Sequence, residues 1–344
     1  MVFHPTAKEN PIISEDHIRS FNGIDLFKFL CAVLVFMIHI PPFQGDVSGF
    51  REGFNFYLQQ YLCRMAVPFY FVSSGFFLFR KMTPEQLDVP AVKRYCFKLL
   101  RLLGTWYILL FIGETGHLWY LRATVVAVVL VSLCFHFRIK STWLWVIAAI
   151  LYGIGLLGDS YHGLVAPLAN IKLFRHMFNG YSLLFVTTRN GVFMGFIYVL
   201  MGAAFANSKK TWKPAAALLG FGLSMVCFFA EVFLLDHYSI PIEYNMYIFL
   251  LPVTYFLFAF AQSLQLKDRP VYAHLRSVGV LLYFSHLLIS AFVNLAATML
   301  NAYWGINIYP YHFTITLLCS VAFSCGVQWL SCKEKFKWIG WLLT

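Results

Sequence analysis

Three ionisable residues lie inside the first long apolar segment of the chain, and their spacing could support chemistry. The segment runs from Asn22 to His39 and contains Asp25, Lys28 and His39. Ionisable side chains are costly within a membrane span and usually face protein or water. Lys28 and His39 are eleven residues apart. On a helix this spacing puts them on one face, about 16 Å apart along the axis. A cation could bind an anionic substrate there, and an imidazole, which exchanges protons near neutral pH, could act as a general base.

Each of these residues also has a structural interpretation. Lys28 could be a lysine near a helix end that extends its amine to the membrane surface. His39 could be an interfacial or hydrogen-bonded structural histidine. Asp25 could either pair with a cation or cap the first turn of the helix. Pro41 and Pro42 follow His39 and predict the end of the helix.

The composition predicts an integral membrane protein. Of 344 residues, 60% are hydrophobic and only 12% are charged, too few to cover the surface of a soluble domain. The net charge is +11, but the basic residues form short clusters between long apolar runs. That pattern is typical of loops at the cytoplasmic face, near anionic lipid, and not of a nucleic-acid-binding surface. We therefore expect the lipid bilayer as a partner and no nucleic acid.

The eight cysteines are scattered, mostly within apolar runs, and no CxxC pair or metal-ligand spacing is present. Isolated cysteines in such runs behave as small buried hydrophobic residues. We expect neither a disulfide framework nor a metal site.

The apolar runs predict an all-α, polytopic fold with about ten transmembrane helices, because a span needs roughly 20 apolar residues. The ten runs are Ile24–Ile40, Leu62–Phe79, Tyr95–Gly113, His117–Phe137, Ser141–Gly158, Arg189–Ala206, Pro214–Leu235, Met246–Leu266, Val278–Leu300 and His312–Leu330.

The basic residues predict the orientation. With ten spans, 20 of the 26 Lys and Arg residues fall on the side of the N-terminus. This bias predicts a multi-pass protein of the inner (plasma) membrane with both termini in the cytoplasm. We expect a cytoplasmic tail over 1–21, a membrane domain over 22–332 and a second cytoplasmic tail over 333–344. No cleavable signal peptide is expected, since the first run carries Asp25 and Lys28.

Several short motifs resemble the membrane acyltransferase-3 family. Lys28-x10-His39, following Ile24-Asp25, resembles the family's R/K-x10-H motif, and four other segments have counterparts in order along the chain. They are Ser73-Ser-Gly-Phe76, His117-Leu-Trp-Tyr-Leu121, Arg189-Asn-Gly191 and Tyr283-Phe-Ser-His286. Lys98-Leu-Leu-Arg101 departs from the family's Arg-x-x-Arg element but keeps the charge. The resemblance implies transfer of an acyl group, typically acetyl, from cytoplasmic acetyl-CoA or another acyl-CoA. The acceptor would be an extracytoplasmic hydroxyl or amine, as in O-acetylation of a cell-envelope glycan or of a small molecule.

The resemblance also implies roles for individual residues. His39 would be catalytic, either by deprotonating the acceptor or through an acyl-His intermediate. The acyl-CoA phosphates would meet a set of cations, and other side chains would line the acyl and acceptor sites. The cations are Lys28, Lys98, Arg101 and Arg94, and the lining residues are Ser73, Ser74, Trp119, Glu114, His117 and Glu231. Glu114 and His117 could equally belong to a solvated loop, and His286 is more typical of helix packing.

A second resemblance is to the membrane half of the membrane-bound serine racemases of vancomycin-resistance clusters. It rests on Arg64-Met-Ala-Val-Pro-Phe69, Thr188-Arg-Asn-Gly-Val-Phe193 and Asn245-Met-Tyr-Ile-Phe-Leu-Leu-Pro252. Those proteins carry a following soluble racemase domain, which we do not expect here. This resemblance implies an alternative function, a transporter or permease-like module for a small amino acid such as serine. A scaffold without chemistry is disfavoured by the ionisable residues within spans, and no oligomeric state is predicted.

Overall fold

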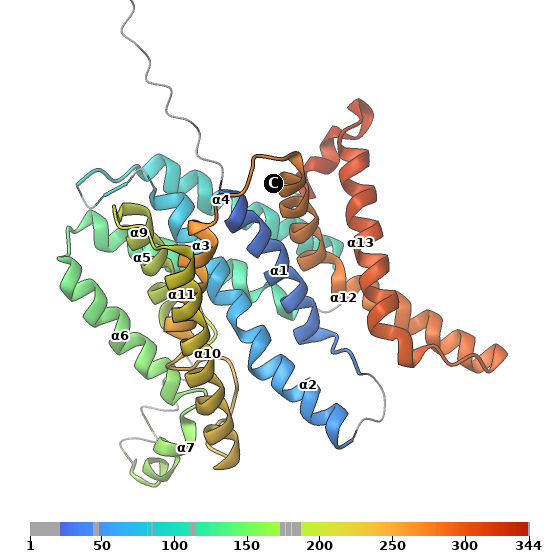
Figure 1. The fold of residues 1–344 in the computed structure, drawn as a ribbon, viewed down its shortest axis with the longest axis horizontal. Coiled ribbons are helices and arrows are strands. Elements are labelled where there is room, and N and C mark those ends of the chain that lie inside the picture. Colours follow the sequence, from blue (N-terminus) through green and yellow to red (C-terminus); the bar gives the residue numbers. More distant parts are fainter. Residues whose placement is uncertain are drawn as a thin grey trace, which may run out of the picture.

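The computed structural model describes residues 21–43, 48–80, 82–83, 85–110, 115–172, 176, 180 and 187–342. These residues are almost entirely helical, and their only β interaction is an isolated bridge between Thr83 and Gln86. The all-α prediction is therefore confirmed (Figure 1). The helices are α1 (Asn22–His39), α2 (Phe50–Gln60), η1 (Leu62–Met65), α3 (Ala66–Phe79), α4 (Val89–Leu109), η2 (Gly116–Leu118), α5 (Trp119–His136), α6 (Ser141–Leu157), α7 (His162–Val165), η3 (Ala166–Asn170), η4 (Gly191–Gly195), α9 (Phe196–Asn207), α10 (Pro214–His237), α11 (Leu250–Ser263), α12 (Pro270–Trp304), η5 (Tyr309–Tyr311), α13 (His312–Ser331) and η6 (Glu334–Leu342).

Within the described residues, six helical segments are long and apolar enough to cross a membrane. They are Asn22–His39, Phe50–Phe79, Gly116–His136, Pro214–His237, Pro270–Trp304 and Tyr309–Ser331. A seventh span is obtained if Ser141–Leu157 and His162–Leu168, bent by 84°, count as one. The chain is therefore a multi-pass membrane protein.

Each of the ten predicted runs coincides with a helix, but fewer than ten meet the requirements of a full span. Gly191–Asn207 and Leu250–Ser263 are apolar but short. The helix α4 has 21 residues but carries four basic ones, at positions 93, 94, 98 and 101. Length and composition thus support six or seven spans, and the remaining helices pack within the bundle without meeting both criteria.

The helix α1 is central because α12, α3 and α11 all pack against it. Glycine allows two of these approaches. A methyl group at Gly23 would lie 2.1 Å from the carbonyl oxygen of Ala261 in α11, and one at Gly279 of α12 would lie 3.3 Å from the backbone of Phe29. Backbones can come this close only where no side chain intervenes. The close approach brings side chains of α11 and α12 within reach of the polar residues of α1.

The helices α1 and α12 run in parallel. Asp25 pairs with Arg276 near the beginning of both helices, and the Phe36 and His286 rings lie 6.0 Å apart farther along. We refer below to the Asp25 end and the His39 end of the molecule. The helix α13 returns from the His39 end, since its residue Phe313 also contacts Phe36, at 5.6 Å between ring centroids. The beginning of α1 and the C-terminal end therefore lie on the same side (Figure 1).

The packing of α3 against α9 yields a prediction about stability. In α3, a methyl group at Gly75 would lie 2.1 Å from the carbonyl oxygen of Val199 in α9, whereas Gly104 in α4 has open space around it. We expect Gly75→Ala to destabilise the protein by about 1–3 kcal/mol, because the two backbones must separate. Gly104→Ala should be neutral or stabilising by up to about 1 kcal/mol. Thermal unfolding in detergent would measure both, and equal melting temperatures for the two variants would contradict the packing.

Candidate functional site

A cavity of about 570 Å³ opens among α1, α3, α4, α5 and α12, toward the Asp25 end. Its charged lining consists of Asp25 and Lys28 from α1, Lys98 from α4 and Arg276 from α12. Asp25 is largely buried, and its Oδ2 atom lies 3.2 Å from Nη1 of Arg276. The structure thus supports the ion-pair interpretation of Asp25 over the capping one. Three cations against one carboxylate make the cavity favourable for an anionic group.

The remaining oxygen of Asp25 distinguishes the cavity from a closed ion-pair network. Its Oδ1 atom is buried and has no hydrogen-bond partner in the described part of the chain. The Lys28 amine lies 4.2 Å from the centroid of the Phe77 ring, a cation–π contact, and forms no ion pair with a described carboxylate. A buried carboxylate oxygen without a donor is costly. Asp25, which lines the cavity, thus has an acceptor without a donor among the described residues, and Lys28 has no described carboxylate partner.

Hydroxyl groups line the opposite wall, and most of them have internal partners. The Tyr70 hydroxyl donates to the carbonyl oxygen of Lys28 at 2.6 Å, and Ser73 Oγ donates to Phe69 O at 2.8 Å. Ser74 Oγ lies 3.1 Å from the Tyr120 hydroxyl. The predicted residues Lys28, Lys98, Ser73 and Ser74 thus meet in one cavity. Of the two serines, Ser74 is the better placed for a ligand, because Ser73 is bonded to its own helix.

Three imidazoles gather at the His39 end. The ring centroids of His39 and His286 lie 5.2 Å apart, those of His117 and His286 5.1 Å, and those of His39 and His117 6.2 Å. His286 is fully buried, whereas His39 is exposed on one side. No group of three metal-binding side chains is formed by the described residues. The sequence analysis predicted His39 and His117 as site residues and interpreted His286 as a packing residue. The motif Tyr283-x-x-His286 was the signal that could have identified it.

The proton position on His286 follows from its neighbours. Its Nδ1 atom lies 2.8 Å from the carbonyl oxygen of Tyr283 and 3.1 Å from that of Leu282. Carbonyls only accept, so Nδ1 carries a proton and Nε2 of the neutral ring is an acceptor. Nε2 is buried and has no partner among the residues that the structure describes.

Tyr283 connects the cavity to the histidine cluster. Its ring lines the cavity, and its hydroxyl donates to the carbonyl oxygen of His117 at 2.6 Å. His286 follows one helical turn later on α12. Lys28 lines the cavity and His39 belongs to the group of three imidazoles, and both lie on the side of α1 that faces α12, as their spacing predicts.

Several predicted site residues lie elsewhere. Arg94 is exposed, 4.0 Å from Asp88, and Arg101 does not line the cavity. Trp119 contacts Arg189, whose Cζ atom lies 5.8 Å from its ring centroid. Glu114 falls outside the described residues.

Glu231 has a structural role. Its carboxylate accepts hydrogen bonds from the Tyr161 hydroxyl at 2.6 Å and from the backbone amides of Ile248 and Phe249 at 2.6 and 2.8 Å. These amides precede α11 and would otherwise lack partners. Glu231 is buried, its carboxylate fixes the beginning of α11, and it does not line the cavity.

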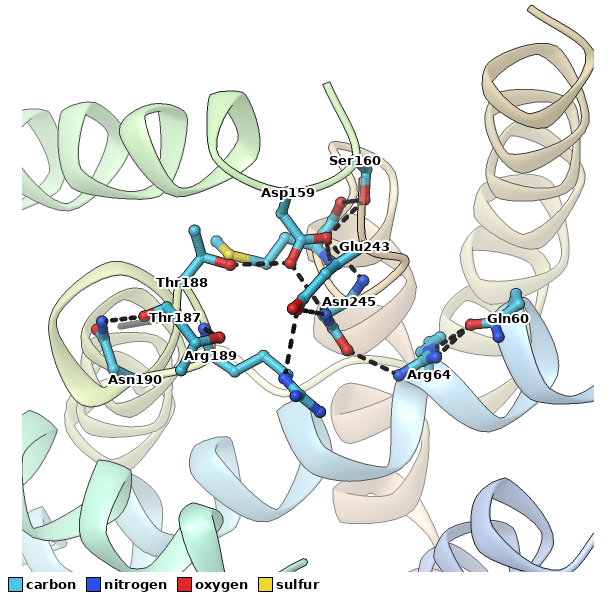
Figure 2. A network of polar contacts seen from close by, with 11 residues as sticks. Gln60, Arg64, Asp159, Ser160, Thr187, Thr188, Arg189, Asn190, Glu243 and Asn245 are labelled. Atoms are coloured by element: carbon cyan, nitrogen blue, oxygen red, sulfur yellow. Dashed lines mark hydrogen bonds and ion pairs between the residues drawn. The ribbon is translucent and has the colours of Figure 1, made fainter. Parts of the chain in front are cut away.

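A buried carboxylate that the sequence analysis missed organises a second polar network (Figure 2). Asp159 is fully buried and accepts from the backbone amides of Asn245 and Met246 at 2.8 and 3.1 Å. It also accepts from the side chains of Thr188 at 2.8 Å, Asn245 at 3.0 Å and Ser160 at 3.0 Å. One carboxylate thus joins its own segment to two others that are distant in the sequence.

Asn245 extends this network to two arginines (Figure 2). Its side-chain oxygen accepts from Arg64 at 2.9 Å, and its amide donates to Glu243 at 2.7 Å. Glu243 in turn lies 3.6 Å from Nε of Arg189. The sequences around Arg64, Thr188 and Asn245 are those that resemble the serine racemases, and in the structure they meet.

These features define a multi-pass, all-α membrane protein with a polar site inside its helix bundle. No family model and no solved structure matches the chain. The chain is similar to an amino-acid racemase of Enterococcus faecalis, with 30% identity over 264 residues, covering 70% of this chain and 35% of that protein. It is 26% identical over 348 residues to the serine/alanine racemase of Enterococcus gallinarum, covering 92% of this chain and 46% of that protein. A further amino-acid racemase of E. faecalis is 27% identical over 306 residues, covering 79% of this chain and 41% of that protein. The chain thus spans less than half the length of these relatives.

The predicted acyl transfer from acetyl-CoA to an envelope acceptor is wrong, because the relatives are enzymes named as racemases. Their names do not support the permease-like alternative either. The structure gives a physical reason for the error: the phosphate-binding set is not assembled, since Arg94 and Arg101 lie outside the cavity lining. Short motifs of polar residues within spans resemble one another across families, because every membrane bundle must satisfy such residues internally.

The Asp159 network generates a stability prediction. We expect Asp159→Asn to lower stability by at least about 2 kcal/mol, because an amide cannot accept all the hydrogen bonds made to the carboxylate. The control is Asp236→Asn, since Asp236 accepts a bond from the Tyr244 hydroxyl at 2.8 Å near the surface. Melting temperatures in detergent would compare the two. An Asp159→Asn melting temperature equal to that of the control would contradict the organising role of Asp159.

Proposed function

We propose that this chain is the membrane-embedded part of an amino-acid racemase of the serine/alanine type, and that its cavity binds the amino acid. The observation that carries the proposal is that Asp25, whose Oδ1 atom has no partner among the described residues, lines one cavity together with Lys28 and Lys98. A zwitterionic amino acid has an ammonium group and a carboxylate on one carbon. The ammonium group would donate to Asp25, and the carboxylate would accept from the two lysines.

The other lining groups fit a small side chain. Arg276 engages Oδ2 of Asp25, and Oδ1 keeps no hydrogen-bond partner among the described residues. Ser74 and Tyr120 add two hydroxyls to the cavity lining, where the hydroxymethyl group of serine would find a partner. The volume of about 570 Å³ lies within the range of small-molecule sites and exceeds what serine alone requires.

The cavity is better suited to binding than to racemisation itself. Racemisation removes the Cα proton from one face and returns a proton to the other, which needs two acid–base groups on opposite sides. Here Lys28 stands on one side, but the hydroxyls of Tyr70 and Tyr283 already donate to backbone carbonyls. More than half of each relative lies outside the match. We assign proton exchange at Cα to that part of such proteins and binding of the amino acid at the membrane to this part.

Amino-acid binding tests this proposal. Protein in lipid nanodiscs should bind radiolabelled L-serine, and Lys28→Gln and Asp25→Asn should each weaken binding about 10–100-fold, the equivalent of one charge-assisted hydrogen bond. Lys93→Gln, an exposed position on the same helix as Lys98, is the matched control and should bind like the wild type. Wild-type protein that binds neither L-serine nor L-alanine would refute the proposal, as would unchanged affinity in Lys28→Gln.

A cellular measurement addresses the racemase assignment. In cells that carry the gene at its own locus, Lys28→Gln should lower the D-serine or D-alanine content measured by chiral chromatography. The Lys93→Gln strain should match the wild type. D-amino-acid levels that do not respond to Lys28→Gln would separate the binding site from racemisation.

We further infer that the Asp25 end faces the cytoplasm, because most basic residues gather on that side. Cys332 is exposed just beyond α13, which ends on the same side as the beginning of α1. In a variant that retains Cys332 alone, a membrane-permeant maleimide should label intact cells and an impermeant one should not. Permeabilisation should restore labelling by the impermeant reagent. Full labelling by that reagent in intact cells would reverse the orientation.

A further inference from the structure

The His39 end contains a group of polar atoms that the amino-acid-binding cavity does not use. They belong to the histidine cluster, defined as His39, His117 and His286, and to Arg189 of the Asp159 network. The strongest indication is the Nε2 atom of His286. It is an acceptor, it belongs to a fully buried ring, and it lacks a partner within the described ranges. A buried acceptor of this kind is normally satisfied by a donor.

Arg189 supplies the complementary group. Its Nε atom pairs with Glu243 at 3.6 Å, and 40% of its side chain is exposed. Its two terminal nitrogens form no hydrogen bond to any described residue, and Figure 2 shows them directed away from the network. Arg64, by contrast, is fully engaged, since Nε donates to Gln60 at 3.1 Å and Nη1 donates to Asn245 at 2.9 Å.

Arg189 contacts the helical segment that carries His117. The Arg189 guanidinium lies 5.8 Å from the ring of Trp119, which follows His117 by two residues in the same helical segment. His39 is the exposed member of the cluster, so the group is open on its side.

We propose a second ligand site at the His39 end, separate from the cavity, for the carboxylate of a small amino acid. The terminal nitrogens of Arg189 would bind the carboxylate through two parallel hydrogen bonds. His286 Nε2 would accept a hydrogen bond from the ammonium group, and His39 would close the open side. The choice of an amino acid as the ligand depends on the proposed function, whereas the position of the site is inferred from Arg189 and His286.

The Asp159 network then has a purpose beyond stability. Asp159 fixes Thr188, the neighbour of Arg189, and Asn245, the partner of Glu243. Glu243 holds only the Nε side of the guanidinium. The network therefore orients Arg189 while leaving its outer edge available for a planar anion.

Chemical protection of His39 tests the site. Diethylpyrocarbonate modifies accessible neutral imidazoles, and mass spectrometry of the His39 peptide measures the rate. In nanodiscs, saturating L-serine should slow modification of His39 at least five-fold. L-Lactate, a carboxylate with a hydroxyl in place of the ammonium group, is the second probe, since its hydroxyl can also donate to His286.

Variants distinguish this site from the cavity. Arg189→Gln should abolish protection, Arg189→Lys should retain part of it because the charge remains, and Arg51→Gln, an exposed arginine on α2, should leave it intact. Lys28→Gln should also leave it intact. Protection that survives Arg189→Gln, or is lost in Lys28→Gln, would overturn the inference, as would a wild type that neither probe protects. Protection by lactate without any serine binding would support the second site and refute the proposed function.

Discussion

The ion pair between Asp25 and Arg276 is the interaction on which the arrangement of the polar residues depends. It joins the beginnings of α1 and α12, and the two helices then run side by side in parallel. The pairing sets the register. One level brings Gly279 against Phe29, and a level farther along brings His39 beside His286. A salt bridge of this kind contributes little net stability, because desolvation offsets the attraction. Its effect here is to specify which residues of the two helices meet.

Polar groups in this bundle fall into two kinds, and the difference separates structure from function. Asp159 and Glu231 are buried carboxylates whose oxygens accept several hydrogen bonds, and they fix loops and helix beginnings. Asp25 Oδ1 and His286 Nε2 are buried acceptors without a donor among the described residues. A buried acceptor without a donor is costly, so these two atoms are the ones that a ligand could satisfy. Both atoms lie along the same face of α1, one near each end.

The sequence predicts the helices well and the partners of polar residues poorly. Each of the ten predicted apolar runs coincides with helix, whereas α2 and α7 were not predicted, and the eleven-residue spacing of Lys28 and His39 places both on one face. The apolar pattern does not distinguish helices that span the membrane from shorter ones, because α9 and α11 are apolar but too short to span it. Glu231 resembles a ligand-binding residue until the amides of Ile248 and Phe249 are seen beside it. Asp159 is inconspicuous in the sequence because its partners lie 29 and 86 residues away. The acyltransferase hypothesis failed for the same reason, since motifs do not show whether Arg94 and Arg101 reach the cavity.

The central claim is that Asp25 and Lys28 together hold a zwitterionic amino acid. A cryo-electron microscopy map of the protein in nanodiscs, with and without saturating L-serine, tests it most directly. The account predicts additional density between the Asp25 carboxylate and the Lys28 amine that appears only with serine. Maps that are identical in this cavity, with the Asp25 carboxylate turned to bind Arg276 through both oxygens, would contradict it.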